Sequence, residues 1–322
     1  MANAITQRQR TAPWIGIGAS GSWTDYREAL EAADLDFDVY NDKAHVWLPD
    51  IPGDADGPVY AADVPGIMVN IREDDNRILG VVSEQYRIVQ NEEAFSLLEP
   101  FTQAGGVITN AGMTEQGLCF MVLRMRNESI LGDDYEFDVL CTNSFNARYP
   151  LALIMTPLRI ICQNMYRQLM GKHDSMLNVR HLSYAQNKLT AAQTVTQNML
   201  AYSSMFGDTM ENLYHTDLPG QRLEHVVEML FPYPKPGGKR EQTSIARVDM
   251  QRREFMDVYY DAQDNQKFHG SALGFVNAYY DYLSHRDPGK NMPGSWADRR
   301  FSNLVSGDAV NQKVLKEVAN GR

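Results

Sequence analysis

The residues best suited to bind a ligand lie in the middle of the chain, where positive charge is concentrated. Residues 141–190 carry six basic side chains and a single acidic one, whereas residues 1–100 carry 7 basic and 18 acidic side chains. The six basic residues are Arg148, Arg159, Arg167, Lys172, Arg180 and Lys188. Because guanidinium and ammonium groups pair with phosphate oxygens, this stretch, which we call the basic island, predicts an anion-binding surface.

Polar and aromatic residues accompany the basic island. Amide and imidazole side chains can add hydrogen bonds to phosphates or base edges, and tyrosine rings can stack on unpaired bases. The expected polar contacts are Asn143, Gln163, Asn164 and His181, and the expected stacking residues are Tyr149, Tyr166 and Tyr184. Two other interpretations stay open. The arginines could be paired with the acidic first hundred residues, and the aromatic rings could belong to the core.

Catalytic chemistry has weaker support in the sequence. There is no His-Glu-x-x-His, Walker A or Gly-x-Ser-x-Gly motif, so we predict no catalytic residues, no metal and no cofactor. Cys162 and His181 would need a third orienting group to act as a nucleophile and base. The acidic run Glu73–Asp75 could bind a cation, but it lies at an expected hairpin tip, where exposed acidic residues are common.

Composition limits the class of protein. The chain has 322 residues, of which 43% are hydrophobic and 22% charged, and its net charge is -11, so the whole molecule is not a general binder of polyanions. Three cysteines without a C-x-x-C spacing indicate reduced thiols and favour a cytoplasmic location. Neither a signal peptide nor an apolar run of about 18 residues is present, so we expect neither export nor contact with a membrane.

The first half of the chain predicts mainly strands. Residues 67–71 and 78–82 flank a turn and predict a hairpin, and residues 107–110, 118–126, 135–142 and 151–155 predict further strands. The almost continuous apolar run in 118–126 is typical of a strand covered on both faces. Two helices are expected, over 23–33 with Ser22 or Thr24 as N-cap, and from Asn91, as N-cap, to about residue 104.

The second half predicts mainly helices. A helix over 159–170 would place Arg159 and Arg167 on one face, and further helices are expected at 183–204, 221–230, 245–262 and 270–284. We therefore predict an α+β fold with an antiparallel sheet. The expected division is a mixed, strand-rich region at 1–158 and a mainly helical region at 159–322 packed on the sheet, with a loop at 231–244.

Several segments carry a family resemblance. Cys141–Ala147, Thr156–Asn164 and Val179–His181 resemble the phage/plasmid-like proteins of the domain of unknown function 932. The likeness extends to Tyr86–Phe95 and Gly274–His285 and so covers most of the chain. This family often has a His-Asp-Gly type of turn where this chain has Phe145-Asn-Ala147. The resemblance implies a protein of mobile genetic elements without an established reaction.

The leading expectation is a non-enzymatic phage protein of DNA metabolism or recombination in the host cytoplasm, which binds single-stranded DNA through the basic island. One alternative is an acidic protein that binds and inhibits a host defence or restriction protein. Another is an enzyme that acts on a small phosphorylated substrate through Arg159, Arg180 and His181. Homo-oligomerisation stays open. If DNA phosphates are contacted, the affinity must fall steeply with salt.

Overall fold

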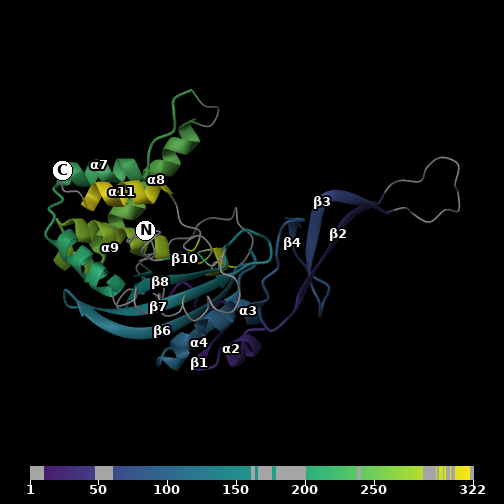
Figure 1. The fold of residues 1–322 in the computed structure, drawn as a ribbon. Coiled ribbons are helices and arrows are strands. Elements are labelled where there is room, and N and C mark those ends of the chain that lie inside the picture. The colour runs from purple at the N-terminus through teal and green to yellow at the C-terminus, as the bar shows by residue number, and fades with distance from the viewer. Residues whose placement is uncertain are drawn as a thin grey trace.

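The structure is a computed structural model that describes residues 11–47, 61–160, 164–165, 176–178, 201–237, 241–285, 295, 297–299, 301, 305 and 309–319. Antiparallel sheets form mainly from the first half of the chain and helices mainly from the second half (Figure 1). The predicted α+β class is confirmed. The division of the chain at residue 158 stays a prediction.

A seven-stranded antiparallel sheet forms the centre of the molecule. Its strands are β1 (Ala19–Trp23), β5 (Val107–Met113), β6 (Cys119–Ile130), β7 (Asp133–Asn143), β8 (Ala152–Arg159), β9 (Asn164–Met165) and β10 (Met176–Asn178). The order is β1-β5-β6-β7-β8-β10, and β9 also pairs with β8. Between β6 and β7, Leu131 and Gly132 both have positive φ, as a tight two-residue hairpin turn requires. The strands expected at 107–110, 118–126, 135–142 and 151–155 are all present, in longer form.

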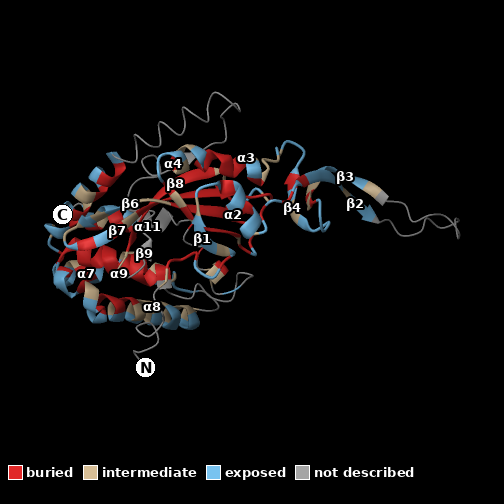
Figure 2. Cartoon of the chain, turned by 90° about the horizontal axis from the view of Figure 1, so that it is seen from below, coloured by how far each residue is buried: buried red, intermediate tan, exposed pale blue. Residues whose placement is uncertain are grey.

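Strand β6 is covered on both faces, as its apolar run predicted. Met121 and Leu123 belong to the larger core cluster, whereas Phe120 and Val122 belong to a smaller cluster on the other face. In the smaller cluster, Phe301 packs edge-on against Phe120, with ring centroids 4.6 Å apart. The sheet is therefore an inner layer of the fold (Figure 2).

Short helices near the N-terminal half cover part of the larger cluster. They are α2 (Tyr26–Ala32), α3 (Asn91–Phe95), the 3-10 turn η1 (Ser96–Leu98) and α4 (Glu99–Gln103). The cap of α2 is Asp25, whose carboxylate accepts from the Arg27 amide at 2.9 Å, so the prediction of Ser22 or Thr24 was wrong. Asn91 is the first residue of α3 and not its N-cap, because its buried side-chain amide donates to the Leu35 carbonyl.

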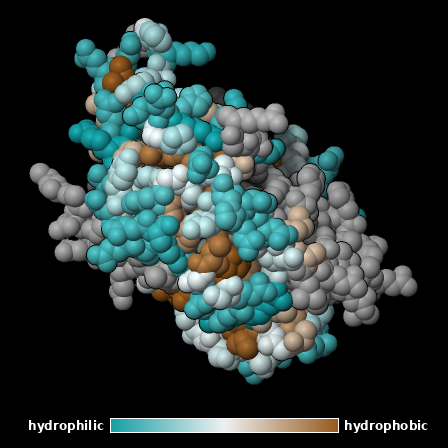
Figure 3. Space-filling view, turned by 90° about the vertical axis from the view of Figure 1, so that its left-hand side faces the viewer, coloured by the Kyte–Doolittle hydropathy of each residue, from teal (hydrophilic) through white to brown (hydrophobic). Residues whose placement is uncertain are grey.

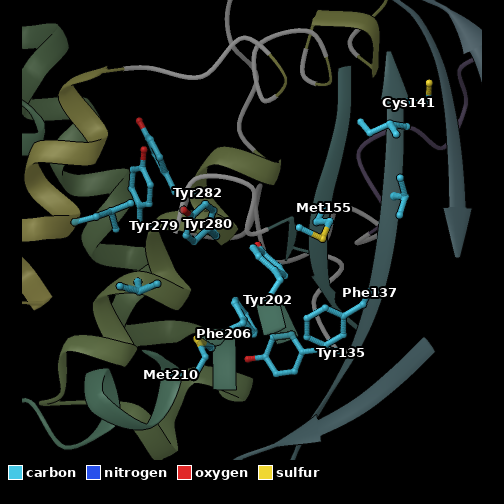
Figure 4. Packing of buried hydrophobic residues seen from close by; sticks show 14 of the residues in the cluster. Tyr135, Phe137, Cys141, Met155, Tyr202, Phe206, Met210, Tyr279, Tyr280 and Tyr282 are labelled. Atoms are coloured by element: carbon cyan, nitrogen blue, oxygen red, sulfur yellow. The ribbon is translucent and has the colours of Figure 1, made fainter. Parts of the chain in front are cut away.

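The C-terminal helices pack against the sheet and against one another. They comprise residues 201–214, α7 (Gly220–Leu230), α8 (Glu241–Asp261), the 3-10 helix η2 (Gln263–Phe268), α9 (Ala272–His285) and α11 (Ala309–Ala319), the last of which was not predicted. Phe206 joins this layer to β7, with its ring 5.4 Å from that of Tyr135 and 5.7 Å from that of Phe137 (Figure 4). The two halves of the chain thus share one core cluster.

A second, three-stranded antiparallel sheet projects from the body, and we call it the arm (Figure 1). It consists of β2 (Val39–Trp47), β3 (Ala61–Arg72) and β4 (Ile78–Ser83), so the predicted hairpin is confirmed. The buried Asn70 side chain anchors the arm by donating to the Phe145 carbonyl at 2.6 Å. Gly80 makes this approach feasible, since a Cβ there would lie 2.6 Å from the Asn146 Cα.

Candidate nucleic-acid interface

Arg159, the centre of the predicted surface, lies in a strand and not in a helix. It is the last residue of β8, and β9 pairs back onto β8 with Asn164 opposite Arg159. The helix predicted over 159–170 is therefore wrong at these positions. Every residue of β8 is buried, and its pairing with β7 across eight positions outweighs the three-four spacing that suggested a helix.

The Arg159 guanidinium is neutralised inside the protein. Only 1% of the residue is exposed, Nη2 lies 2.6 Å from Asp133 Oδ2, and Nη1 lies 2.9 Å from Asp264 Oδ2. Nη2 also donates to the Asp264 carbonyl, and Lys267 Nζ lies 2.8 Å from the other Asp133 oxygen. This network ties the end of β8 to the start of β7 and to η2. The expectation that Arg159 faces a ligand is wrong, and its acidic partners lie outside the first hundred residues.

Two further predicted contacts are also internal. Asn143 is 3% exposed, and its side-chain amide donates to the Val89 carbonyl and to Asn91 Oδ1. Tyr149 is 5% exposed and packs in the smaller core cluster. An amide and a ring buried in this way cannot reach a nucleic acid, so the contact role of Asn143 and the stacking role of Tyr149 are corrected.

Arg148 is the predicted residue that the structure places at the surface. It is exposed on the 144–150 loop and forms no ion pair with a described residue. The neighbouring 84–90 loop touches this loop, since the Tyr86 hydroxyl donates to the Ser144 carbonyl at 2.6 Å. Arg87 on that second loop is also exposed and has no described ion pair. Sequence reasoning missed Arg87, because it lies in the acidic first hundred residues.

The other members of the basic island cannot be placed. Gln163, Tyr166, Arg167, Lys172, Arg180, His181, Tyr184 and Lys188, with Cys162, lie outside the described residues. For Asn164 the structure describes the backbone pairing of β9 only. The helix expected at 183–204 is described from residue 201 onward, where the chain is helical.

A polar row that was not predicted from the sequence crosses three strands of the large sheet, with two buried members and one partly exposed arginine. Arg124 on β6, Asp138 on β7 and Thr156 on β8 are direct cross-strand neighbours. Among the described residues, neither Asp138 oxygen nor the Thr156 hydroxyl has a hydrogen-bond partner, and Arg124 Nε lies 3.9 Å from Asp138 Oδ1. Burial, with Glu136 nearby, raises the pKa of Asp138 to about 8, although Arg124 opposes this. Burial therefore favours the neutral, protonated form of the Asp138 carboxyl.

The described cysteines and acidic turn provide no reactive site. Cys119 and Cys141 are buried free thiols, and burial raises the pKa of Cys119 to about 12, which disfavours the reactive thiolate. In the acidic turn, Asp74 is bound by Arg72, and Asp75 lies 3.8 Å from Arg77. Within the described part of the chain, no group of three or more His, Cys, Asp or Glu side chains is arranged to hold a metal ion.

A pocket of about 490 Å³ opens among the C-terminal helices. Its described lining residues are Asp217, Leu218, Pro219, Gly220, Leu223, Tyr259, Tyr260, His269 and Gly270. His269 Nε2 lies 2.7 Å from the Tyr259 carbonyl, to which it must donate. No lysine or arginine is among these described lining residues. The surrounding helical face is mainly hydrophilic, with separate apolar islands (Figure 3).

These features define an α+β protein in which an antiparallel sheet, whose central strands are buried on both faces, carries a projecting three-stranded arm and a helical layer. A family model for a domain of unknown function, DUF932, matches residues 78–313, and the chain belongs to this family. No curated protein and no solved structure gives a significant match. Among the described helices, none has the length and apolar character needed to cross a lipid bilayer.

Proposed function

We propose that the protein binds single-stranded DNA without catalysing a reaction on it. The observation that carries this proposal is the pair of touching loops at residues 84–90 and 144–150, each of which presents an exposed arginine without a described carboxylate partner. Unpaired arginines on adjacent loops suit the phosphates of a flexible strand. Arg148 belongs to the basic island, whose excess of positive charge adds support from the sequence.

The set of residues that we propose to contact DNA differs from the set that the sequence predicted. Arg159, Asn143 and Tyr149 take part in the fold and are removed from the set. Arg148 remains as a proposed contact, and Arg87 is added to it. The residues that remain predicted contacts are Gln163, Asn164, Arg167, Lys172, Arg180 and His181, with Tyr166 and Tyr184 as predicted stacking residues. The resemblance to phage/plasmid-like proteins supports a setting in the DNA metabolism or recombination of a mobile element, in the cytoplasm of its host.

Fluorescence anisotropy with a labelled oligonucleotide across a salt series tests this proposal. The parent should bind at low salt and lose affinity steeply as salt rises. Arg148→Ala and Arg87→Ala should each weaken binding and reduce the slope of log affinity against log salt by about 0.7 for each phosphate that the arginine neutralises. Arg253→Ala, which removes an exposed arginine of α8, is the matched control and should leave the slope unchanged. Absence of binding at low salt, or equal slopes for all four proteins, contradicts the proposal.

A second candidate function is binding of a basic protein, such as a host defence or restriction protein. Internal pairing favours it, because Arg159 is bound to the buried carboxylates of Asp133 and Asp264 and its charge therefore cannot offset acidic residues at the surface. With a net charge of -11, the molecule attracts cationic partners. A positive salt-dependent oligonucleotide signal favours the first function, whereas its absence favours this one.

A further inference from the structure

The arm carries an apolar face that the described part of the chain leaves exposed. Residues that pair directly across antiparallel strands point to the same face. One such row is Tyr40, Ile71 and Ile78, the next is Asp42, Val69 and Val81, and Ile67 follows opposite Ser83. Ile78 is 63% exposed, Val81 65%, Tyr40 41% and Ile67 36%. Three strands therefore contribute to one continuous apolar face.

The opposite face of the arm is already used by the fold. Its residues Val39, Asn70, Arg72 and Val82 are buried, and Asn70 is bonded to the body at Phe145. The base of the arm is thus held with one face against the body and the apolar face outward. Exposed apolar side chains that gather in this way mark an interaction surface.

A partner protein can bind the apolar face of the arm more readily than it can pair with the edge strands of the arm. Strand β2 has a register shift between Lys43 and His45, and a bulge with a lysine blunts the pairing of an edge strand. On the other side, β4 approaches the 145–146 backbone at Gly80. A partner would therefore dock on Tyr40, Ile78 and Val81 and not extend the sheet.

The acidic residues around the apolar face favour a positively charged partner. Asp42 lies on the apolar face, exposed Glu73 and Asp75 lie in the turn at one end, and exposed Glu84 follows β4 at the other end. Within the described residues of the arm itself, the lysine and the two arginines are already paired. Arg72 is bound to Asp34 and Asp74, Lys43 to Asp63, and Arg77 lies beside Asp75. A second copy of the chain would bring these same acidic residues together, which disfavours a symmetric dimer through this face.

We propose that the apolar face of the arm docks a basic amphipathic segment of another protein. The apolar side chains of the segment cover Ile78 and Val81, and its lysine or arginine side chains lie against Asp42 and Glu84. This inference deepens the second candidate function, on which it rests, and it is independent of DNA binding.

The test uses a fluorescein-labelled short peptide of alternating leucine and lysine, and a twin with glutamate in place of lysine. The double variant Ile78→Ser/Val81→Ser should bind the basic peptide at least about tenfold more weakly than the parent, because two apolar side chains no longer cover the leucines of the peptide. The matched control Met205→Ser/Met250→Ser, which changes two exposed methionines outside the arm, should bind like the parent. The glutamate twin should bind at least about tenfold more weakly to every protein.

Any other result of the peptide-binding experiment contradicts a specific part of the proposal. If the parent does not bind the basic peptide at low salt, both the inference and the second candidate function fail. If the parent binds but the arm variant binds equally well, the arm is not the site and the second candidate survives. If light scattering shows a parent dimer that Ile78→Ser/Val81→Ser abolishes, the occupant is a second copy of the chain. Circular dichroism should show native spectra for both double variants, since all four positions are exposed.

Discussion

Arg159 is a structural residue, and its replacement should destabilise the whole fold. It neutralises Asp133 and Asp264, whose side chains are 5% and 9% exposed. Arg159→Ala leaves these carboxylates without their main cation, and breaking a buried ion pair on one side costs about 3–5 kcal/mol. Urea unfolding followed by tryptophan fluorescence measures this. Arg148→Ala, the exposed control, should change the free energy of unfolding by less than about 0.5 kcal/mol. Equal values for the two variants would show that the Arg159 network is not structural.

Asp138 should make the stability of the protein depend on pH. Its pKa is raised from 3.8 to about 8, chiefly by burial, so the folded state holds a proton that the unfolded state releases between these values. The stability that depends on the neutral carboxyl is complete below pH 4 and is lost as the pH rises towards 8, by at most about 1.4 kcal/mol per pH unit.

Asp138→Asn removes this titration, so its stability relative to the parent should increase steadily from pH 5 to pH 8. Urea unfolding of both proteins across this range measures the difference, and other titrating groups cancel because both proteins share them. A difference that stays constant with pH would mean that Asp138 is already ionised in the folded protein.

At the scale of elements, the close contact between the arm and the body depends on Gly80. A Cβ at this position would lie 2.6 Å from Asn146 Cα and 2.7 Å from the Phe145 carbonyl oxygen, so Gly80→Ala must move backbone. We expect a loss of about 1–3 kcal/mol from this overpacking. Amide hydrogen exchange should become faster in β3 and β4 while β6 and β7 keep their protection. Ser83→Ala, at an exposed position of the same strand, is the control and should leave exchange unchanged.

The elements that could be predicted from the sequence are those that their own local residue pattern determines. The hairpin of β3 and β4 was predicted from two strand-like segments that flank a turn, and β6 from its almost continuous apolar run, and both are confirmed. Arg159 shows the limit of this reasoning. The residues after Pro157 have helical spacing, but their pairing with β7 and the carboxylate of Asp264, 105 positions away, are non-local. Asp138 was missed for the same reason, since only the neighbouring strands make its carboxyl buried.

At the scale of the whole molecule, the shared core should make the described halves unfold together. The larger cluster combines Phe137 of β7 with Phe206, and Leu30 of α2 with residues of α9 such as Phe275. Circular dichroism, which follows the helices, and tryptophan fluorescence should therefore report coincident urea transitions. A chain cut after residue 158 would lose Phe206 and Arg159 and leave Tyr135 and Phe137 without their covering rings. This fragment should not unfold cooperatively, whereas a cooperative transition of the isolated fragment would show that residues 1–158 form an independent domain.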